Sequence, residues 1–329
     1  MSKHRFTSII GPIIKRYLSL KEALGRKYTY ERIILTKLDI FLADTGMDLT
    51  EESFAQWTSK YYHLASGVRR NWMRVTRNLC LYRRRTEPDC FMPDLSLFPP
   101  LHQSVRPHIF TKKQILLLLS AIKDLKPNSR SPLLHETYRL ALVLLYTTGL
   151  RRGELMRLTV GDYNKMERTL LIRESKFHKS RLLPLSEDGA HEIDSHLSFR
   201  RAHRFPVAND TSLLWNNYGK GGTYSATALG TIFRGLFRKN GIHTAAGGIP
   251  RLHDFRHSFA VNALLRWYRS GDDIQTKLPM LAVYMGHVSI VSTQYYLHFI
   301  EEIASTASSI FERHCGAIVT PFVQQGGQS

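Results

Sequence analysis

The sequence predicts a mainly α-helical protein with two domains and one small β-hairpin sheet. Apolar residues recur at helical spacing through most of the chain. This rhythm stops in residues 86–107, which contain several prolines and are typical of an interdomain linker. Two short apolar runs around a polar turn, Thr169–Arg173 and Arg181–Leu185, predict the hairpin. A chain of 329 residues is long enough for two domains that each bury a core.

The chain is strongly basic. It has 46 Lys and Arg against 27 Asp and Glu, a formal net charge of +19 and a pI near 10.0. An anionic partner is therefore expected, and nucleic acid fits best, because neutralising phosphates releases counterions. Composition alone leaves association with a ribosome or a membrane surface as the alternative.

Cysteine use and hydropathy predict a cytoplasmic, nucleoid-associated protein with no membrane partner. Cys80, Cys90 and Cys315 form no CxxC pair and are odd in number, so neither a zinc site nor a disulfide framework is expected. The apolar runs Ile115–Leu119 and Leu140–Tyr146 are far shorter than the ~20 residues that span a bilayer. The apolar stretch near the N-terminus is interrupted by glycine and proline, which makes it a poor signal peptide.

The first domain begins with helices that the sequence marks clearly. Thr50 is a good N-cap, because two glutamates follow it in the first turn. Phe54, Trp57, Tyr61 and Leu64 then fall on one helical face. We expect this stripe to lie in the core and not to form a stacking platform for bases.

The following helix is basic on the side away from its apolar face. Its apolar rhythm runs from Val68 to Tyr82, and arginine takes many of the other positions with no acid between them. A solvated helix face normally mixes both signs, so this face predicts contact with a phosphate backbone. A merely soluble arginine-rich helix is the alternative. The candidate DNA-binding residues here are Arg69, Arg70, Arg74, Arg77, Arg83 and Arg84.

The domain boundary is expected near Pro107. The predicted parts are an N-terminal helical domain at 1–100, a linker at 101–108, a second domain at 109–315 and a polar tail at 316–329. In the second domain, Thr111 and Gln114 form a capping box in front of an apolar helix. Ser131-Pro132 is expected to open another helix, which ends at Gly149.

Six residues of the second domain fit a metal-free phosphoryl transfer site. His253 and Arg256 stand at i and i+3, on one face of a predicted helix. His287 and Tyr296 follow downstream, Arg151 stands in a Gly-Leu-Arg motif upstream, and Lys176 lies in the predicted hairpin turn. In this order and spacing, the set resembles the tyrosine recombinase (phage integrase) family, roughly from residue 17 to residue 313.

The resemblance implies a nucleophile and two phosphate-binding residues. Tyr296, nine residues after His287, would attack the phosphodiester and conserve its bond energy as a 3′-phosphotyrosyl link. Arg151 and Arg256 would bind the scissile phosphate, because a guanidinium offers planar, bidentate donors and keeps its charge. Glu154 either orients Arg151 or has a purely structural role.

The resemblance also implies how protons move. Lys176 would protonate the leaving 5′ oxygen, and His253 would act as the general base for the tyrosine. His287 would hydrogen-bond the phosphate or hold the site together. His257, one residue beyond Arg256, is expected to point away from these residues and to be structural. The alternatives left open are Tyr295 for Tyr296, Arg152 for Arg151 and Lys179 for Lys176.

At the level of the whole protein, the resemblance implies site-specific DNA recombination of the integration, excision or mobile-element type. The two domains would form a C-shaped clamp, a core-binding domain and a catalytic domain, on double-stranded DNA with a specific recombination site. It further implies a homotetramer on synapsed DNA, with accessory recombinases or DNA-bending proteins as candidate partners. The segment after Tyr296, which contains Ile300, Ile303 and Phe311 in helical rhythm, is expected to pack into a neighbouring subunit. Arg234, Arg238 and Lys239, on a helix predicted at 227–240, are further candidates for DNA contact.

Neither a cofactor nor a metal is expected. The glycine-rich run Gly219–Gly222 lacks the spacing of a phosphate-binding loop, and His243 and His253 do not have metal-ligand spacing. Two other functions remain as alternatives: DNA relaxation like that of a type IB topoisomerase, and a catalytically silent DNA-binding regulator. The complete set of six candidate residues argues against the regulator.

Overall fold

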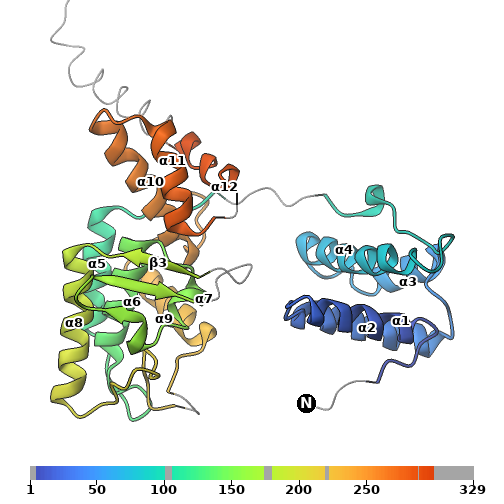
Figure 1. Ribbon diagram of the computed structural model, residues 1–329, viewed down its shortest axis with the longest axis horizontal. Helices are drawn as coiled ribbons and strands as arrows, with labels where there is room; N and C mark the ends of the chain where they lie inside the picture. Colours follow the sequence, from blue (N-terminus) through green and yellow to red (C-terminus); the bar gives the residue numbers. More distant parts are fainter. Residues whose placement is uncertain (1–4, 101–105, 174–179, 219–221, 288, 300–329) are drawn as a thin grey trace, which may run out of the picture. The chain divides into compact units, whose positions relative to one another are not determined.

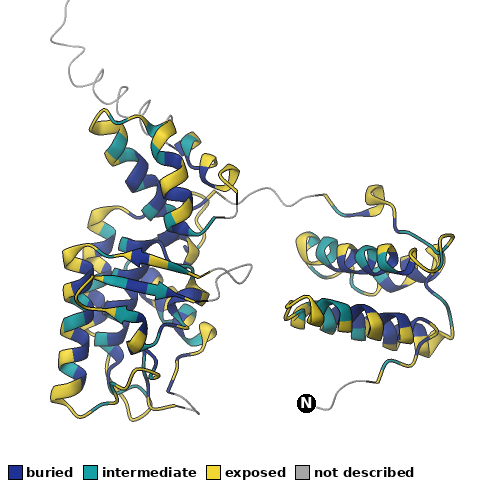
Figure 2. Ribbon diagram, in the orientation of Figure 1, coloured by how far each residue is buried: buried dark blue, intermediate teal, exposed yellow. Residues whose placement is uncertain are grey.

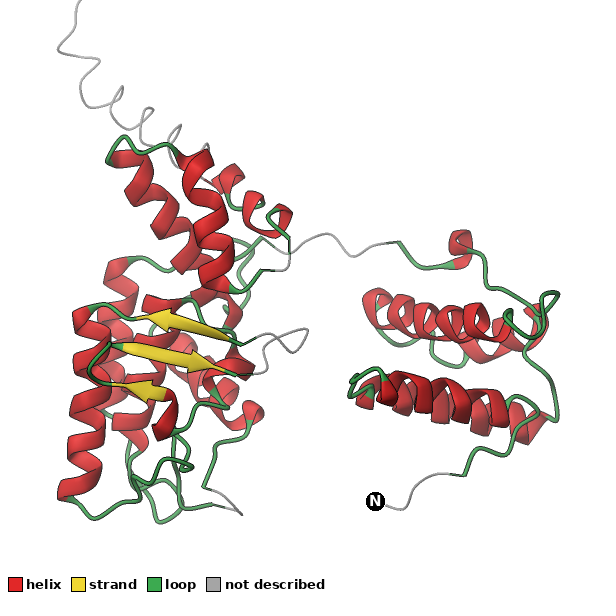
Figure 3. Ribbon diagram, in the orientation of Figure 1, coloured by secondary structure: helices red, strands yellow, loops and turns green. Residues whose placement is uncertain are grey.

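The computed structural model describes residues 5–100, 106–173, 180–218, 222–287 and 289–299. The chain divides into two compact units, Met1–Val105 and Arg106–Ser329, and each has a hydrophobic core of its own. Helices dominate both units, and one small sheet lies in the second (Figure 1, Figure 3). The predicted fold class, mainly α with a small β-hairpin sheet, is confirmed.

The first unit is built from helices that pack around aromatic side chains. Its helices are α1 (Gly11–Ala23), α2 (Thr29–Thr45), α3 (Glu51–Ser59) and α4 (Ser66–Arg83), followed by a 3₁₀ turn at Leu95–Leu97. The hydroxyl of Thr50 accepts the N–H of Ser53, so the predicted cap of α3 is confirmed. Trp57 and Trp72 stack in the core with ring centroids 5.9 Å apart. Figure 2 shows these helices buried along one side and exposed along the other, as their apolar spacing predicted.

The second unit combines longer helices with two short ones of a single turn, α7 and α12. Its helices are α5 (Lys112–Lys123), α6 (Leu134–Thr148), α7 (Arg152–Leu155), α8 (Glu187–Ala202), α9 (Ala226–Lys239), α10 (His253–Arg269), α11 (Ile274–Met285) and α12 (Val291–Gln294), with a 3₁₀ turn at Val160–Asp162. The predicted capping box of Thr111 and Gln114 is present at α5. None of the helices in the described part of the chain has the length and apolar character needed to cross a membrane.

Helix α6 begins later than the sequence predicted. It starts at Leu134, whereas Ser131-Pro132 was the expected opening. The side-chain oxygen of Asn128 accepts the N–H groups of Arg130 and Ser131, and Asn128 and Ser131 also pair through their backbones. These bonds close a turn, so the chain enters the helix only after it.

The sheet has three antiparallel strands in the order β1-β2-β3. They are β1 (Tyr163–Asn164), β2 (Thr169–Ile172) and β3 (Arg181–Pro184). The predicted hairpin corresponds to β2 and β3, in which Leu170 stands opposite Leu183 and both are fully buried. The short strand β1 was not predicted, because two residues are too few to show an alternating pattern.

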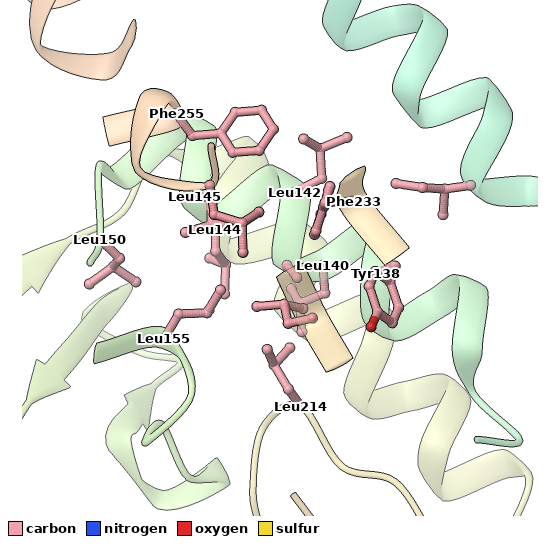
Figure 4. Close-up of a cluster of buried hydrophobic side chains, with 14 of the residues drawn as sticks. Tyr138, Leu140, Leu142, Leu144, Leu145, Leu150, Leu155, Leu214, Phe233 and Phe255 are labelled. Atoms are coloured by element: carbon pink, nitrogen blue, oxygen red, sulfur yellow. The ribbon is translucent and has the colours of Figure 1, made fainter. Parts of the chain in front are cut away.

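The core of the second unit holds the segments that surround the candidate site. Leu150 and Leu155 are buried on either side of Arg151, and Phe255 is buried between His253 and Arg256. Figure 4 shows these apolar side chains together with those of α6. Polar residues next to such anchors have little freedom to move, because their backbone is fixed by packing.

Candidate active site

Arg151 lies directly after the end of α6. Gly149 ends that helix in the left-handed conformation (φ 61°), and Arg151 then caps α7 with an extended backbone. Its backbone N–H donates to Glu154 Oε2 at 3.0 Å, and its Nη1 donates to Glu154 Oε1 at 2.7 Å. The side chain stays 24% exposed. The local turn therefore keeps part of the guanidinium accessible while Glu154 holds its position.

Glu154 is a buried anion between two arginines. Besides the two hydrogen bonds from Arg151, its carboxylate accepts Nη1 and Nη2 of Arg181, each at 3.1 Å. Burial by itself would raise the pKa of Glu154, but the hydrogen bonds from Arg181 and Arg151 overcome this effect and lower the pKa to about 2. Glu154 is therefore ionised at neutral pH.

Arg256 is buried in α10, with 1% of its surface exposed. Its Nη1 donates to the carbonyl of Gly149 and its Nη2 to the carbonyl of Met285, both at 2.7 Å. These carbonyls lie at the C-terminal ends of α6 and α11, where helix dipoles favour positive charge. Burial and the nearby charge of Arg151 lower the pKa of Arg256 to about 9, so it remains protonated at pH 7.

The end of α11 connects three arginines from different parts of the unit. This helix ends at Gly286 in the left-handed conformation (φ 66°). Three consecutive carbonyls accept hydrogen bonds there: Tyr284 O from Arg181 Nε at 2.9 Å, Met285 O from Arg256 Nη2, and Gly286 O from Arg151 Nη2 at 2.7 Å. A single helix terminus thus fixes the guanidinium groups relative to one another.

Two of the candidate histidines have lowered pKa values. His253 is the first residue of α10, and its partly desolvated ring has a lowered pKa, to which the charges of Arg256 and Arg251 add. His287 follows Gly286, and its Nδ1 shares a hydrogen bond of 2.7 Å with the hydroxyl of Thr293. Burial, then the charges of Arg256 and Arg151, lower the pKa of His287 to about 4.

Tyr296 lies just after α12 and is only 3% exposed. Its ring is nearly parallel to that of His287, with an interplanar angle of 14° and centroids 6.4 Å apart. Burial raises the pKa of Tyr296 to about 12, although the charge of Arg256 opposes this rise. The alternative nucleophile, Tyr295, is 36% exposed.

The structure corrects the interpretation of His257. This residue was expected to point away from the site. It stands four residues after His253, and the centroids of the two rings are 4.8 Å apart. Its ring also lies 5.5 Å from that of Tyr296. Burial and the neighbouring His253 lower the pKa of His257 to about 4, and its buried Nδ1 has no hydrogen-bond partner within the described residues. His257 therefore belongs to the surroundings of Tyr296.

Five of the six predicted residues come together around the ends of α6, α11 and α12: Arg151, His253, Arg256, His287 and Tyr296. Lys176 and its alternative Lys179 lie outside the described residues, between β2 and β3. The expected apolar segment after Tyr296 also lies outside them, from residue 300 onward. Arg181 was not singled out from the sequence, and its place as the first residue of β3 gave no sign of a partner in Glu154.

The arginines of α4 do not form one open basic face. Arg83 is 9% exposed and makes a bidentate ion pair with Asp48, with both distances at 2.7 Å, and a further ion pair with Glu87. Three of its N–H groups thus bind acids from outside the helix, and its role in DNA binding stays a prediction. Arg70 and Arg77 donate to the carbonyls of Pro99 and Pro93 and so fasten the segment that follows α4.

Other basic candidates remain exposed. In the first unit these are Arg74 on α4 and Arg84, the residue that caps the end of this helix. Arg69 is partly buried, and its guanidinium lies over the ring of Tyr62 at 4.4 Å. On α9, Arg234, Arg238 and Lys239 are exposed, and Lys239 lies 3.7 Å from Asp124. These residues are accessible to a phosphate backbone, so their role in DNA binding stays a prediction.

Comparison with known proteins agrees with the resemblance. The sequence pattern of the phage integrase family matches residues 108–302. The protein y4rB of Sinorhizobium fredii, which carries the name of an integrase/recombinase, is 31% identical over 303 residues, which cover 91% of this chain and 96% of the relative. The tyrosine recombinase XerD of Mycobacterium tuberculosis is 30% identical over 209 residues, which cover 62% of each chain.

Solved structures share the fold. The XerH site-specific recombinase bound to its palindromic difH substrate has a TM-score of 0.59 at 21% identity, with 86% of this chain and 79% of that chain covered. The Tn1549 transposon integrase in complex with transposon right-end DNA has a TM-score of 0.58 at 19% identity, with 86% and 94% covered. Family pattern and relatives together cover most of the sequence. The chain therefore belongs to the phage integrase family, the tyrosine-type site-specific DNA recombinases.

Proposed function

We propose that this recombinase cuts and rejoins DNA through a 3′-phosphotyrosyl intermediate formed by Tyr296. The observation that supports this most is the convergence of Arg151, Arg256, His287 and Tyr296 on the end of α11. The tyrosine oxygen attacks the scissile phosphorus, the 5′ oxygen leaves, and the phosphate ester to the enzyme replaces the broken bond. A 5′ hydroxyl of another strand then attacks the phosphotyrosine and restores a phosphodiester without ATP.

Arg151 and Arg256 are the proposed phosphate ligands. Each guanidinium has more N–H donors than its contacts with Glu154 and the helix carbonyls use, so both can bind phosphate oxygens without losing their supports. Preorganised donors of this kind stabilise the charge that develops in the transition state. Removing either one is expected to cost on the order of 3 kcal/mol in the barrier.

The histidines and the hairpin lysine are the proposed proton carriers. A neutral His253 can accept the proton of Tyr296 as general base, because its pKa is lowered below the ordinary value. His287, held by Thr293, hydrogen-bonds the phosphate. Lys176 protonates the leaving 5′ oxygen, as the family resemblance implies.

Catalysis on this geometry needs an opening step. Tyr296 and Arg256 are both almost fully buried, so binding of a DNA phosphate to them requires a rearrangement that exposes these side chains. Such a step would couple cleavage to DNA binding. The energy for it comes from contacts with the DNA that the basic surface makes.

The assembly is proposed on the same basis. Residues 1–100 and 109–315 would be the core-binding and catalytic domains of a clamp on a specific double-stranded site. Because strand exchange joins two duplexes, a homotetramer on synapsed DNA is the proposed active form, with accessory recombinases or DNA-bending proteins as further partners. Residence on the nucleoid follows from this activity.

Covalent capture of DNA tests the proposed function. The protein and its Tyr296→Phe variant are expressed in the native host, denatured, and any attached DNA is sequenced. We expect adducts with the wild type only, and all of them at one short sequence. Adducts that persist in the variant would move the nucleophile to another residue, with Tyr295→Phe as the next variant, and no adduct with either protein would contradict the proposal.

A further inference from the structure

Arg181 connects the hairpin to both sides of the candidate active site. It is the first residue of β3, and its side chain is 12% exposed. Nη1 and Nη2 donate to the two carboxylate oxygens of Glu154, while Nε donates to the carbonyl of Tyr284. Nη1 and Nη2 therefore bind the carboxylate that also holds Arg151. Nε binds a carbonyl directly before that of Met285, which accepts from Arg256.

Arg181 and Arg151 bind the same two parts of the site, the carboxylate of Glu154 and the end of α11. Glu154 Oε1 accepts from both arginines, at 2.7 Å from Arg151 and 3.1 Å from Arg181. The same arginines bind carbonyls two residues apart at the end of α11, Tyr284 and Gly286. A closed ring of hydrogen bonds results, in which a shift of Arg181 changes where Glu154 and the α11 terminus place Arg151.

The local packing leaves little room for another arrangement. A Cβ atom at Gly286 would meet Arg181 Nη1 at 2.8 Å, so the guanidinium lies against the backbone of this glycine. Lysine cannot reproduce this geometry, because its ammonium is a point charge and lacks the planar fork that binds a carboxylate through two nitrogens. The site therefore requires both the planar shape and the charge of the Arg181 guanidinium.

We propose that Arg181 is a positioning residue for the cleavage step, which acts through Glu154 and the end of α11 to place Arg151 and Arg256 on the scissile phosphate. Because β3 leads directly out of the hairpin turn, Arg181 also sets the position of the hairpin relative to these arginines. The inference rests on the proposed function. It assigns to Arg181 an effect on the rate of cleavage and none on the affinity for DNA.

The test uses the full-length protein and a DNA duplex that contains the site recovered by covalent capture, nicked so that cleavage cannot be reversed. Adduct formation is followed at saturating DNA, and Kd for the intact duplex is measured separately. For Arg181→Gln we expect a rate roughly tenfold to a hundredfold lower, since small misplacements of catalytic groups cost this much, with Kd changed less than about twofold. Arg181→Lys should be nearly as slow.

A matched control separates positioning from general loss of stability. Arg139 on α6 makes a bidentate ion pair with Glu192 on α8, away from the site. Arg139→Gln therefore removes a bidentate arginine–glutamate pair that is more exposed, with the Arg139 side chain 43% exposed against 12% for Arg181. Its cleavage rate should stay near that of the wild type, and urea unfolding of both variants shows that each is folded in the assay. A double-mutant cycle with Glu154→Gln completes the design: the double variant should be no slower than the slower single variant, because both changes break the same ring.

The possible outcomes are distinct. Wild-type cleavage by Arg181→Gln, full rescue by lysine, or independent and multiplying effects of Arg181→Gln and Glu154→Gln would each overturn the positioning role. An equal loss in Arg139→Gln would also overturn it, since any broken ion pair would then suffice. Absence of an adduct with the wild-type protein would instead contradict the proposed function itself.

Discussion

The ring of His257 lies 5.5 Å from the ring of Tyr296, closer than the 6.4 Å that separates His287 from the same tyrosine. His257 is neutral, because burial lowers its pKa to about 4, and its buried Nδ1 has no hydrogen-bond partner within the described residues. The ring therefore supports the tyrosine by packing, while its polar atom gains nothing from burial.

The first prediction concerns this contact. His257→Phe should keep adduct formation within about threefold of the wild type, because an aromatic ring is retained and a buried polar atom without a partner is removed. His257→Ala should lower the free energy of unfolding by about 2 kcal/mol through lost packing. Urea unfolding and the nicked-duplex assay measure the two effects. A Phe variant that folds normally but does not cleave would show that the imidazole transfers a proton.

The second prediction concerns Gly149, whose carbonyl accepts Arg256 Nη1. Its φ of 61° is left-handed, and a Cβ would meet Phe259 Cδ1 at 2.5 Å. Gly149→Ala should therefore lower the free energy of unfolding by more than the roughly 1 kcal/mol that the backbone conformation costs, and should slow cleavage by displacing Arg256. Gly46 is a matched control, since it ends α2 with a φ of 65° and an added Cβ would have nothing within 4 Å. Equal losses of stability in the two alanine variants would contradict the clash.

The third prediction concerns the ion pairs of Arg83. Arg83→Gln should lower the free energy of unfolding of the first unit by about 1 kcal/mol, because it removes ion pairs to two partly exposed acids, Asp48 and Glu87. The neighbouring Arg84 is exposed, so Arg84→Gln should leave stability within about 0.5 kcal/mol of the wild type. Urea unfolding of both variants checks this difference. Equal unfolding free energies of the two variants would show that the ion pairs of Arg83 do not stabilise the unit.

The fourth prediction separates phosphate contacts from structural arginines. If Arg74 and Arg84 bind DNA phosphates, each glutamine variant should reduce the slope of log K against log salt by about 1. Arg77→Gln should have a smaller effect on this slope, because Arg77 is only partly exposed, whereas Arg74 and Arg84 are exposed. Titrations of one duplex at several salt concentrations give the slopes. Unchanged slopes for Arg74 and Arg84 would place the DNA surface of this unit elsewhere.

The fifth prediction concerns acid. His196 in α8 is 5% exposed, and burial followed by the charge of Arg200 lowers its pKa to about 4 from the ordinary value of 6.5. The unfolded chain therefore binds more protons than the folded chain between these values. The neutral, buried state of His196 costs no unfolding free energy above about pH 6.5. As the pH falls from 6.5 towards 4, the unfolding free energy of the protein decreases on account of His196, by about 3 kcal/mol near pH 4. His196→Leu should flatten the dependence of unfolding free energy on pH, and curves parallel to the wild type would exclude His196 as a cause.

Features that depend on neighbours a few residues away could be predicted from the sequence. The caps at Thr50 and Thr111, the end of α6 at Gly149 and the helical phase of His253 and Arg256 all rest on hydrogen bonds or spacings within one or two turns. The family could likewise be recognised from the order and spacing of the motif residues, because order and spacing can be read without knowing any contact.

Hydrogen bonds and ion pairs between residues far apart in the chain could be identified only in the folded protein. The partner of Arg83 is Asp48, which lies 35 residues earlier in the chain, and the partners of Arg181 lie 27 and 103 residues away. His257 reaches Tyr296 because the segment around α12 packs on α10, which a helical wheel of α10 alone does not show. A buried charged group is stable only when it has hydrogen-bond partners. Which groups become its partners depends on how the whole core packs, and local sequence does not show this.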